Sequence, residues 1–135
     1  VNRELDAFIC GMGTGGTVTG IGRFLKKEAQ RIHIAGIEPA GSPFISQGRS
    51  GSHKIQGIGP GFRPKVLDLS VLDEVITVED EEALSMMKGL HRREGLMVGI
   101  SSGANVAGAL KLAEKGFRRI ATVAPDTYER YLSLT

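Results

Sequence analysis

The sequence has no tryptophan, a single cysteine and almost no net charge, and each shortage excludes a class of protein. One cysteine, Cys10, cannot form an internal disulfide framework, which fits a reducing compartment. A formal charge of +2, with aromatic residues at 5%, argues against a nucleic-acid surface, which needs basic stripes and stacking aromatics. No apolar run is long enough to cross a bilayer. We therefore expect a cytoplasmic protein that binds no nucleic acid, no membrane and no metal.

The chain also lacks an initiating methionine and any internal repeat or domain boundary. Its 135 residues suffice for one hydrophobic core, and 41% apolar with 24% charged residues is typical of a folded domain. We expect residues 1–135 to be one domain, or most of one, and a piece of something longer.

Glycine, unlike cysteine and tryptophan, is abundant in this sequence. The 19 glycines cluster in residues 11–22 and 48–61. Clustered glycine indicates unusual backbone angles or a close approach of another group to the main chain. Both segments are therefore predicted to be binding loops.

Short apolar runs alternate with helical patterns along the chain. The apolar periodicity predicts strands at 6–10, 33–39, 73–78, 96–100 and 118–125, and helices at 17–30, 79–95 and 101–116. Strand, helix and strand in this order form a right-handed βαβ unit with parallel strands. The predicted fold is α/β and three-layered, with a mostly parallel sheet and Rossmann-like βαβ units. A last turn or helix is expected from Asp126 onward.

Residues 40–65 show no regular periodicity. A loop of this length in a compact domain is usually functional or disordered. Its apolar residues Phe44, Ile55, Ile58 and Phe62 argue against disorder. This segment is predicted to be a structured loop over a site, and Gly20 and Gly22 are predicted to let the first helix pack closely on the sheet.

The loop after the first predicted strand reads as a cup for a phosphate group. It consists of Gly13, Thr14, Gly15, Gly16 and Thr17. Its glycines allow successive backbone N–H groups to point inward, and the following helix adds its positive N-terminal end. The two threonines add hydroxyl donors. The loop lacks the Gly-Lys-Ser/Thr of a Walker A motif, so a nucleoside-triphosphate site is not predicted.

Two ligands fit this loop, and the local pattern leaves the choice open. Gly11, Gly13 and Gly16 match the dinucleotide fingerprint, and Glu38 ends the second predicted strand, where a ribose-binding carboxylate belongs. A smaller phosphorylated cofactor is favoured by Ser101, which the run 96–100 delivers to the same sheet edge. A hydroxyl opposite a phosphate cup suits a heteroaromatic ring nitrogen. Ser102, by contrast, also reads as a simple helix N-cap.

Several motifs in order make the sequence recognisable: "GTGGT", "HKIQGIGPGF", "REGLMVGISSGA" and "ERYLS". Together they resemble the cysteine synthase (O-acetylserine sulfhydrylase) family, pyridoxal 5'-phosphate enzymes of fold type II. The resemblance implies that the chain is the C-terminal, cofactor-holding part of an enzyme that makes cysteine from O-acetylserine and sulfide. It also implies a homodimer at full length, and the C-terminus of serine acetyltransferase as a partner.

The resemblance implies a role for each matching residue. Gly13 to Thr17 would hold the cofactor phosphate, and Ser101 would hydrogen-bond the pyridine nitrogen. A neutral hydroxyl there gives a weaker electron sink than a carboxylate would, which suits elimination and replacement at the β-carbon. The four residues expected to border the substrate are Gln56, Gly57, Ile58 and Gly59.

The family's Schiff-base lysine motif is missing from the sequence. Lys54 and His53 are interpreted as loop residues, not as catalytic groups. We therefore expect no catalytic residue in this chain and no turnover by the chain alone. Thr127 and Tyr128 depart from the family pattern, which leaves the role of Asp126 open. The alternatives are an NAD-binding module, a related enzyme such as cystathionine β-synthase or O-phosphoserine sulfhydrylase, and a non-catalytic regulatory domain.

Overall fold

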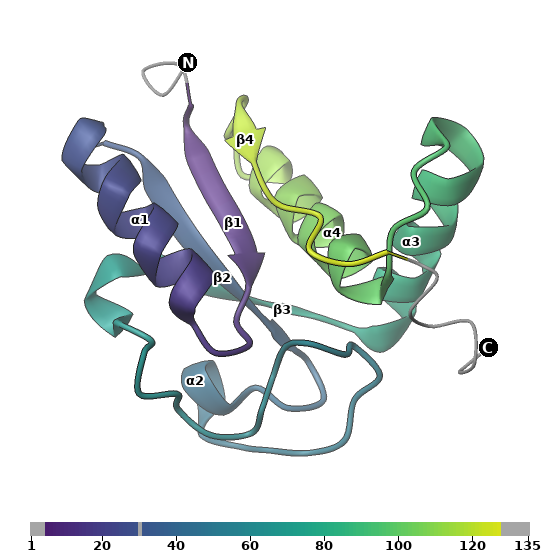
Figure 1. The fold of residues 1–135 in the computed structure, drawn as a ribbon, viewed down its shortest axis with the longest axis horizontal. Coiled ribbons are helices and arrows are strands. Elements are labelled where there is room, and N and C mark those ends of the chain that lie inside the picture. Colours follow the sequence, from purple (N-terminus) through teal and green to yellow (C-terminus); the bar gives the residue numbers. More distant parts are fainter. Residues whose placement is uncertain (1–4, 30, 128–135) are drawn as a thin grey trace.

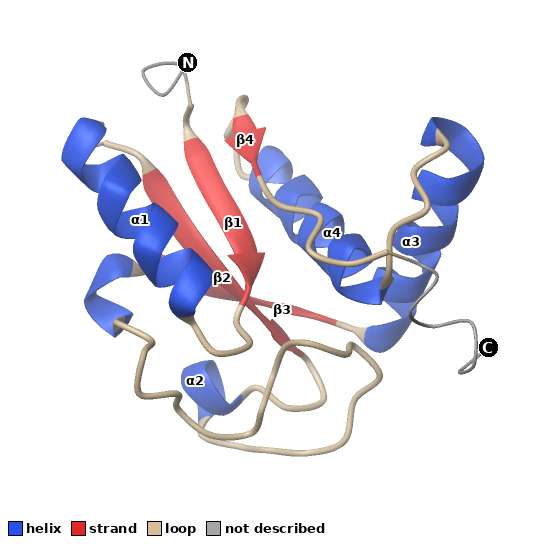
Figure 2. Ribbon diagram, in the orientation of Figure 1, coloured by secondary structure: helices blue, strands red, loops and turns tan. Residues whose placement is uncertain are grey.

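The computed structural model describes residues 5–29 and 31–127, and its centre is a four-stranded parallel sheet (Figures 1 and 2). The strands are β1 (Ala7–Gly11), β2 (His33–Pro39), β3 (Glu74–Val78) and β4 (Ile120–Ala121). Their order in the sheet is β3-β2-β1-β4, and each neighbouring pair is parallel. The predicted α/β fold with βαβ units is confirmed.

Helices cover both faces of the sheet (Figure 1). Helix α1 (Gly16–Glu28) packs on the face that carries Phe8 and Cys10. Helices α3 (Asp80–Glu94) and α4 (Ile100–Glu114) pack on the opposite face, over Ala7 and Ile9. Because successive strand residues point to opposite faces, a strand covered on both sides is apolar throughout, which explains the continuous run in β1.

Only one of the two glycines inside α1 gives the close packing that the sequence suggested. A methyl group at Gly22 would lie 2.4 Å from Val71 Cγ1 and 3.2 Å from Ile34 Cγ2. Gly20, in contrast, has no neighbouring atom within 4 Å of such a methyl group and faces solvent. The prediction was therefore right for Gly22 and wrong for Gly20, which lies on the outer side of the helix.

The run 96–100 is not the buried strand that its apolar residues predict. Leu96 and Met97 are 52% and 55% exposed, and the segment contributes one isolated bridge, between Val98 and Thr127. Ile100 already belongs to α4. Short apolar runs cannot distinguish a buried strand from the lead-in to a helix, which is the reason for this error.

The last predicted strand is much shorter than residues 118–125. Only Ile120 and Ala121 pair with β1, at its amino end. Thr122 still contacts β1, because its hydroxyl donates to the Ile9 carbonyl at 2.5 Å. Beyond this point the chain no longer pairs with β1, and a space opens between the two segments.

The start of α3 is not capped by Asp80, although aspartate is among the residue types most often found at an N-cap. The N-cap is Glu79, which forms a capping box with Glu82. The Asp80 carboxylate instead accepts a hydrogen bond from the Lys54 backbone N–H at 3.0 Å. Asp80 thus ties the long loop to α3.

Residues 40–65 form a structured loop, as predicted, with the short helix α2 (Phe44–Gln47) within it. Ile55 and Ile58 are buried and anchor the loop to the core on the α3–α4 side. Phe62, in contrast, is 58% exposed and does not anchor the loop. The turn or helix expected beyond Asp126 lies mostly outside the described residues.

Candidate functional site

A cavity of about 310 Å³ lies at the carboxyl end of β1. Its walls are the loop that leads from β1 into α1, residues 56–58, the first turns of α4 and the segment 123–126. The strand order reverses between β1 and β4, and ligands of open α/β sheets bind outside the carboxyl ends of strands at such a reversal. The early departure of the chain after β4 creates the space.

Most of the predicted site residues line this one cavity. They are Gly13, Thr14, Gly15, Thr17, Gln56, Gly57, Ile58 and Ser101. Two do not line it. Gly16 turns toward the Thr14 hydroxyl, to which its N–H donates at 3.3 Å, and Gly59 faces a separate, smaller pocket.

The loop Gly13 to Thr17 leaves backbone donors free at the start of α1. Gly15 is the N-cap in the left-handed conformation, with φ of 86°, and no side chain caps the helix. The first turn of α1 contains no acidic residue. Among the hydrogen bonds of the described residues, none uses the N–H of Gly13, Thr14 or Gly15 as a donor. Uncapped donors and the helix dipole together make this end of the cavity suitable for an anion.

The two glycine-rich segments meet backbone to backbone. A methyl group at Gly13 would lie 2.3 Å from the Gly57 carbonyl oxygen, and one at Gly11 would lie 2.4 Å from Ile58 Cγ2. The Gly59 N–H donates to the Met12 carbonyl at 3.0 Å. Glycine is needed at these positions because any side chain would push residues 56–59 away from the first loop.

Ser101 and Asp126 also line the cavity, and Ser102 holds the Asp126 carboxylate from outside the lining. Ser101 Oγ donates to Asp126 Oδ2 at 2.8 Å, and Ser102 Oγ donates to Asp126 Oδ1 at 2.5 Å. All three residues are at least nine-tenths buried. Neither serine caps α4, whose N-cap is Gly99, so the N-cap interpretation of Ser102 was wrong. Asp126, which the sequence left open, is part of the site.

Asn105 is a site residue that the sequence analysis missed. Its Oδ1 accepts from the Gly11 N–H at 2.8 Å, and its Nδ2 donates to the Val123 carbonyl at 2.8 Å. It therefore bridges β1 and the departing chain across the space between them. The sequence could have indicated Asn105, because it lies four residues after Ser101 and so shares the same face of α4.

No positive side chain lines the cavity among the described residues. Burial raises the pKa of the Cys10 thiol to about 12, so this lining residue is neutral. Lys54 is exposed and outside the lining. His53 is also outside: its Nδ1 accepts from the Ile55 N–H at 3.1 Å, and its Nε2 lies 3.0 Å from the Gly59 carbonyl oxygen. His53 thus stabilises the loop.

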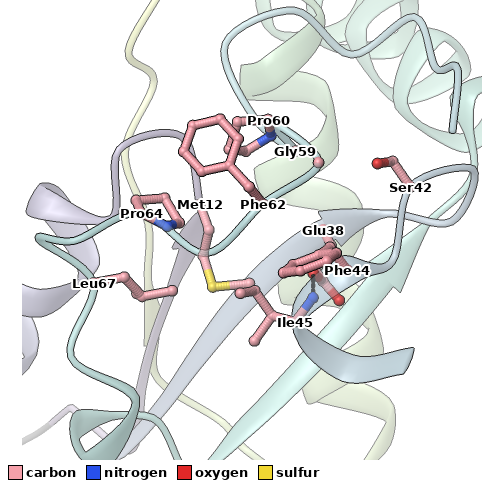
Figure 3. A pocket seen from close by; sticks show the side chains of 11 residues that line it. Met12, Glu38, Ser42, Phe44, Ile45, Gly59, Pro60, Phe62, Pro64 and Leu67 are labelled. Atoms are coloured by element: carbon pink, nitrogen blue, oxygen red, sulfur yellow. Dashed lines mark hydrogen bonds between the residues drawn. The ribbon is translucent and has the colours of Figure 1, made fainter. Parts of the chain in front are cut away.

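Glu38 lines a different pocket, which Figure 3 shows. This second pocket has a volume of only about 10 Å³. The Glu38 carboxylate accepts three hydrogen bonds, from the Ile45 N–H at 2.5 Å, the Ser46 N–H at 2.9 Å and the Ser46 hydroxyl at 2.6 Å. It is 3% exposed and anchors α2, so it is not positioned to bind a ribose in the main cavity.

The two ends of the main cavity suit a ligand with a phosphate group and a polar ring. Neutral donors gather at the Gly13–Thr17 end, and hydroxyl and carboxylate oxygens gather at the Ser101 end. The residues present therefore fit a phosphorylated heteroaromatic cofactor better than a dinucleotide. Within the described residues, no helix is long and apolar enough to span a membrane, and no group of His, Cys, Asp or Glu could hold a metal ion.

Fold and site together define the class: a parallel α/β domain that binds a small phosphorylated ligand at the strand ends. The sequence matches the family described as pyridoxal-phosphate dependent enzyme over residues 1–126. The chain belongs to this family, whose cofactor fits the two ends of the cavity.

Within this family, the chain is similar to several individual enzymes. Cysteine synthase B of Campylobacter jejuni is 54% identical over 134 residues, which are 98% of this chain and 44% of that protein. The structure of O-acetyl serine sulfhydrylase isoform 3 from Entamoeba histolytica has 38% identity and a TM-score of 0.93, covering 98% of this chain and 40% of that one. An O-acetylserine dependent cystathionine beta-synthase from Helicobacter pylori has 39% identity and a TM-score of 0.91, covering 98% and 43%. The chain spans less than half the length of these relatives.

Proposed function

We propose that this chain is the cofactor-holding part of a cysteine synthase. The whole enzyme would convert O-acetylserine and sulfide to cysteine and acetate by pyridoxal-phosphate dependent β-replacement. One observation carries the proposal: the free N–H donors of Gly13, Thr14 and Gly15 and the Ser101 hydroxyl group line one cavity. The similarity to cysteine synthase B over 98% of the chain supports the choice of reaction.

Each part of the cavity has a role in this proposal. Gly13, Thr14, Gly15, Gly16 and Thr17 bind the cofactor phosphate through N–H and hydroxyl donors. Ser101 orients the pyridine ring through its nitrogen. When bound, pyridoxal phosphate withdraws electrons from the substrate's α-carbon.

The substrate would lie beside the loop that packs against the phosphate cup. The residues proposed to border it are Gln56, Gly57, Ile58 and Gly59. Gly59 does not line the cavity itself. Its N–H donates to the Met12 carbonyl and so fixes the loop beside the cavity. No lysine lines the cavity in the described part of the chain. The Schiff-base lysine is therefore supplied by another part of the enzyme, and this chain alone is inactive.

The proposal extends to the surroundings of the enzyme. A single buried cysteine is compatible with a cytoplasmic location. A homodimer, with the serine acetyltransferase C-terminus as a partner, follows from the family resemblance.

A cystathionine β-synthase remains the second candidate, because the Helicobacter pylori structure matches with a TM-score of 0.91. O-phosphoserine in place of O-acetylserine is the substrate variant to test beside it.

The test is a binding titration with pyridoxine 5'-phosphate, which has the cofactor's ring and phosphate but no aldehyde to react with surface lysines. We expect it to shift the amide NMR signals of Gly13–Thr17 and to compete with inorganic phosphate. NAD should bind more weakly, and Glu38→Ala should not change the relative affinity. Tighter binding of NAD, lost in Glu38→Ala, would contradict the proposal.

A further inference from the structure

The edge of β1 that faces β4 completes its hydrogen bonds with side chains. Within the described residues, β1 pairs with β4 only over the first two residues of each strand. Farther along the same edge, the Ile9 carbonyl accepts from the Thr122 hydroxyl, and the Gly11 N–H donates to Asn105 Oδ1 at 2.8 Å. Side chains therefore replace strand pairing at the point where the cavity begins.

The Asn105 carboxamide takes the place of a peptide group in this gap. Like a peptide group, it has a carbonyl acceptor and an N–H donor. Its Oδ1 accepts from Gly11, and its Nδ2 donates to the Val123 carbonyl at 2.8 Å. Two directly paired strands would lie about 4.8 Å apart, and a carboxamide inserted between them requires a wider separation. Asn105, Gly11 and Val123 all line the cavity that this separation leaves.

Helix α4 gives Asn105 a rigid base. A methyl group at Gly103 would lie 2.3 Å from the Ala83 carbonyl oxygen on α3, and one at Gly108 would lie 2.6 Å from Ile37 Cδ1 on β2. The α4 backbone therefore rests directly on α3 before Asn105 and on the sheet after it. Asn105 itself is only 1% exposed.

We propose that Asn105 is a positioning residue that sets the width of the cavity between β1 and residues 123–126, and so the fit of the ligand's ring. The inference rests on the proposed function, because the ring is that of the proposed cofactor. Neither hydrogen bond of Asn105 involves the loop Gly13–Thr17, which is proposed to hold the phosphate. Asn105 therefore acts on binding of the ring and not on binding of the phosphate group.

The experiment compares two ligands on the same variants. Pyridoxine 5'-phosphate has both a ring and a phosphate, whereas inorganic phosphate has no ring. Asn105→Leu keeps the branched outline of the side chain without its polar atoms, and Asn105→Ala shortens it. Each variant should bind pyridoxine 5'-phosphate about tenfold more weakly, with less than about a twofold change for inorganic phosphate. Because leucine is larger than asparagine and alanine is smaller, a loss shared by both variants reports the hydrogen bonds and not the volume.

Amide NMR and a control variant separate this role from a general loss of stability. The Gly11 amide signal should shift in both Asn105 variants, since its hydrogen-bond acceptor is gone, and the signals of Gly13–Thr17 should not. Glu38→Ala also removes buried hydrogen bonds, but those of the smaller pocket. It should keep the affinity of the unaltered chain for both ligands.

The outcomes are separable. If both Asn105 variants keep their affinity for pyridoxine 5'-phosphate, or lose inorganic phosphate to the same extent, the role of Asn105 is overturned and the proposed function stands. If the unaltered chain binds neither ligand, the proposed function is overturned, and this inference with it.

Discussion

At the scale of the residue, single glycines decide whether the cavity exists. Gly13 is the clearest case, because the backbone of residues 56–59 occupies the space in which a side chain would stand. The contact is between two main chains, so neither partner can move a side chain aside. A side chain at Gly13 would therefore displace residues 56–59.

We predict that Gly13→Ala weakens binding of pyridoxine 5'-phosphate by more than about tenfold and lowers stability by about 1–3 kcal/mol, the usual cost of overpacking. The added methyl group would lie 2.3 Å from the Gly57 carbonyl oxygen. Calorimetric titration and urea unfolding measure the two effects. Gly89→Ala is the control, since Gly89 lies within α3 with no atom within 4 Å of the added methyl group. Equal affinities for the two variants would contradict the prediction.

Glu38 gives a second prediction at this scale. Glu38→Ala removes a buried acceptor of three hydrogen bonds, two of which come from backbone N–H groups of α2. We expect a loss of about 2–3 kcal/mol in the free energy of unfolding, as for buried charge-assisted bonds. Binding of pyridoxine 5'-phosphate should change far less, because Glu38 does not line the main cavity. A stable variant with lost binding would show that Glu38 belongs to the site.

At the scale of the element, α1 is held to the sheet by small residues and by ion pairs with the segment before β3. Gly22 allows Val71 and Ile34 to approach the helix. Arg23 and Lys26 on the same helix pair with Asp68 and Asp73 at 2.7 and 2.9 Å. These contacts fix α1 against the sheet and against the segment before β3.

The two glycines of α1 should respond in opposite directions to alanine. Gly22→Ala should destabilise the chain by about 1–3 kcal/mol, because its methyl group would overlap Val71 and crowd Ile34. Gly20→Ala should stabilise it by about 0.5–1 kcal/mol, because alanine has the higher helix propensity and the site is open. Thermal and urea unfolding of both variants give the comparison. The same sign for both would refute the packing argument.

Asp68 gives the pH prediction. Hydrogen bonds from Ser70, and then the Arg23 guanidinium, lower the pKa of Asp68 from 3.8 to about 2. A folded-state pKa below the unfolded one means that the contribution to stability is present above pH 3.8 and is lost as the pH falls toward 2. The difference in urea midpoint between the unaltered chain and Asp68→Asn should therefore shrink over this range. Ser70→Ala, which removes the main donor, should raise the pKa of Asp68 in an NMR titration, and an unchanged value would contradict the assignment.

At the scale of the whole molecule, the sheet is covered on both faces but large apolar side chains remain at the surface. Phe24, Phe62, Val66, Leu96 and Met97 are each more than half exposed. They lie on α1, on the long loop, directly after that loop and before α4. Such side chains favour contacts with other protein surfaces when they gather in patches.

We expect the isolated chain to self-associate or to be marginally stable, which sedimentation at several concentrations and thermal melting measure. Residues 40–65 should exchange amide hydrogens fastest, because they have few backbone hydrogen bonds of their own. Within this loop the N–H groups of Ile45 and Ser46, held by Glu38, and of Gly59, held by the Met12 carbonyl, should be slow exceptions. A two-state monomer with the whole loop strongly protected would contradict this expectation.

Local patterns in the sequence were enough to predict β1, β2, α1 and the glycine-rich loop that joins β1 to α1. These features depend on residues near one another in the chain: alternating faces in a buried strand, and glycines before a helix. The family resemblance also singled out residues 56–59 and Ser101. Ser101 lines the cavity, although the strand at 96–100 that was expected to deliver it to the sheet edge does not form.

Only the tertiary structure decided what surrounds that edge. Residues 96–100 and 118–125 have the composition of strands, yet most do not pair, because pairing depends on which neighbour the sheet offers. The space left where residues 122–126 depart from β1 is the cavity, and Asn105 bridges it from another element. The same long-range placement turns Glu38 toward α2 and brings Asp126 behind Ser101. Contacts between residues far apart in the chain set these positions, and no local pattern encodes them.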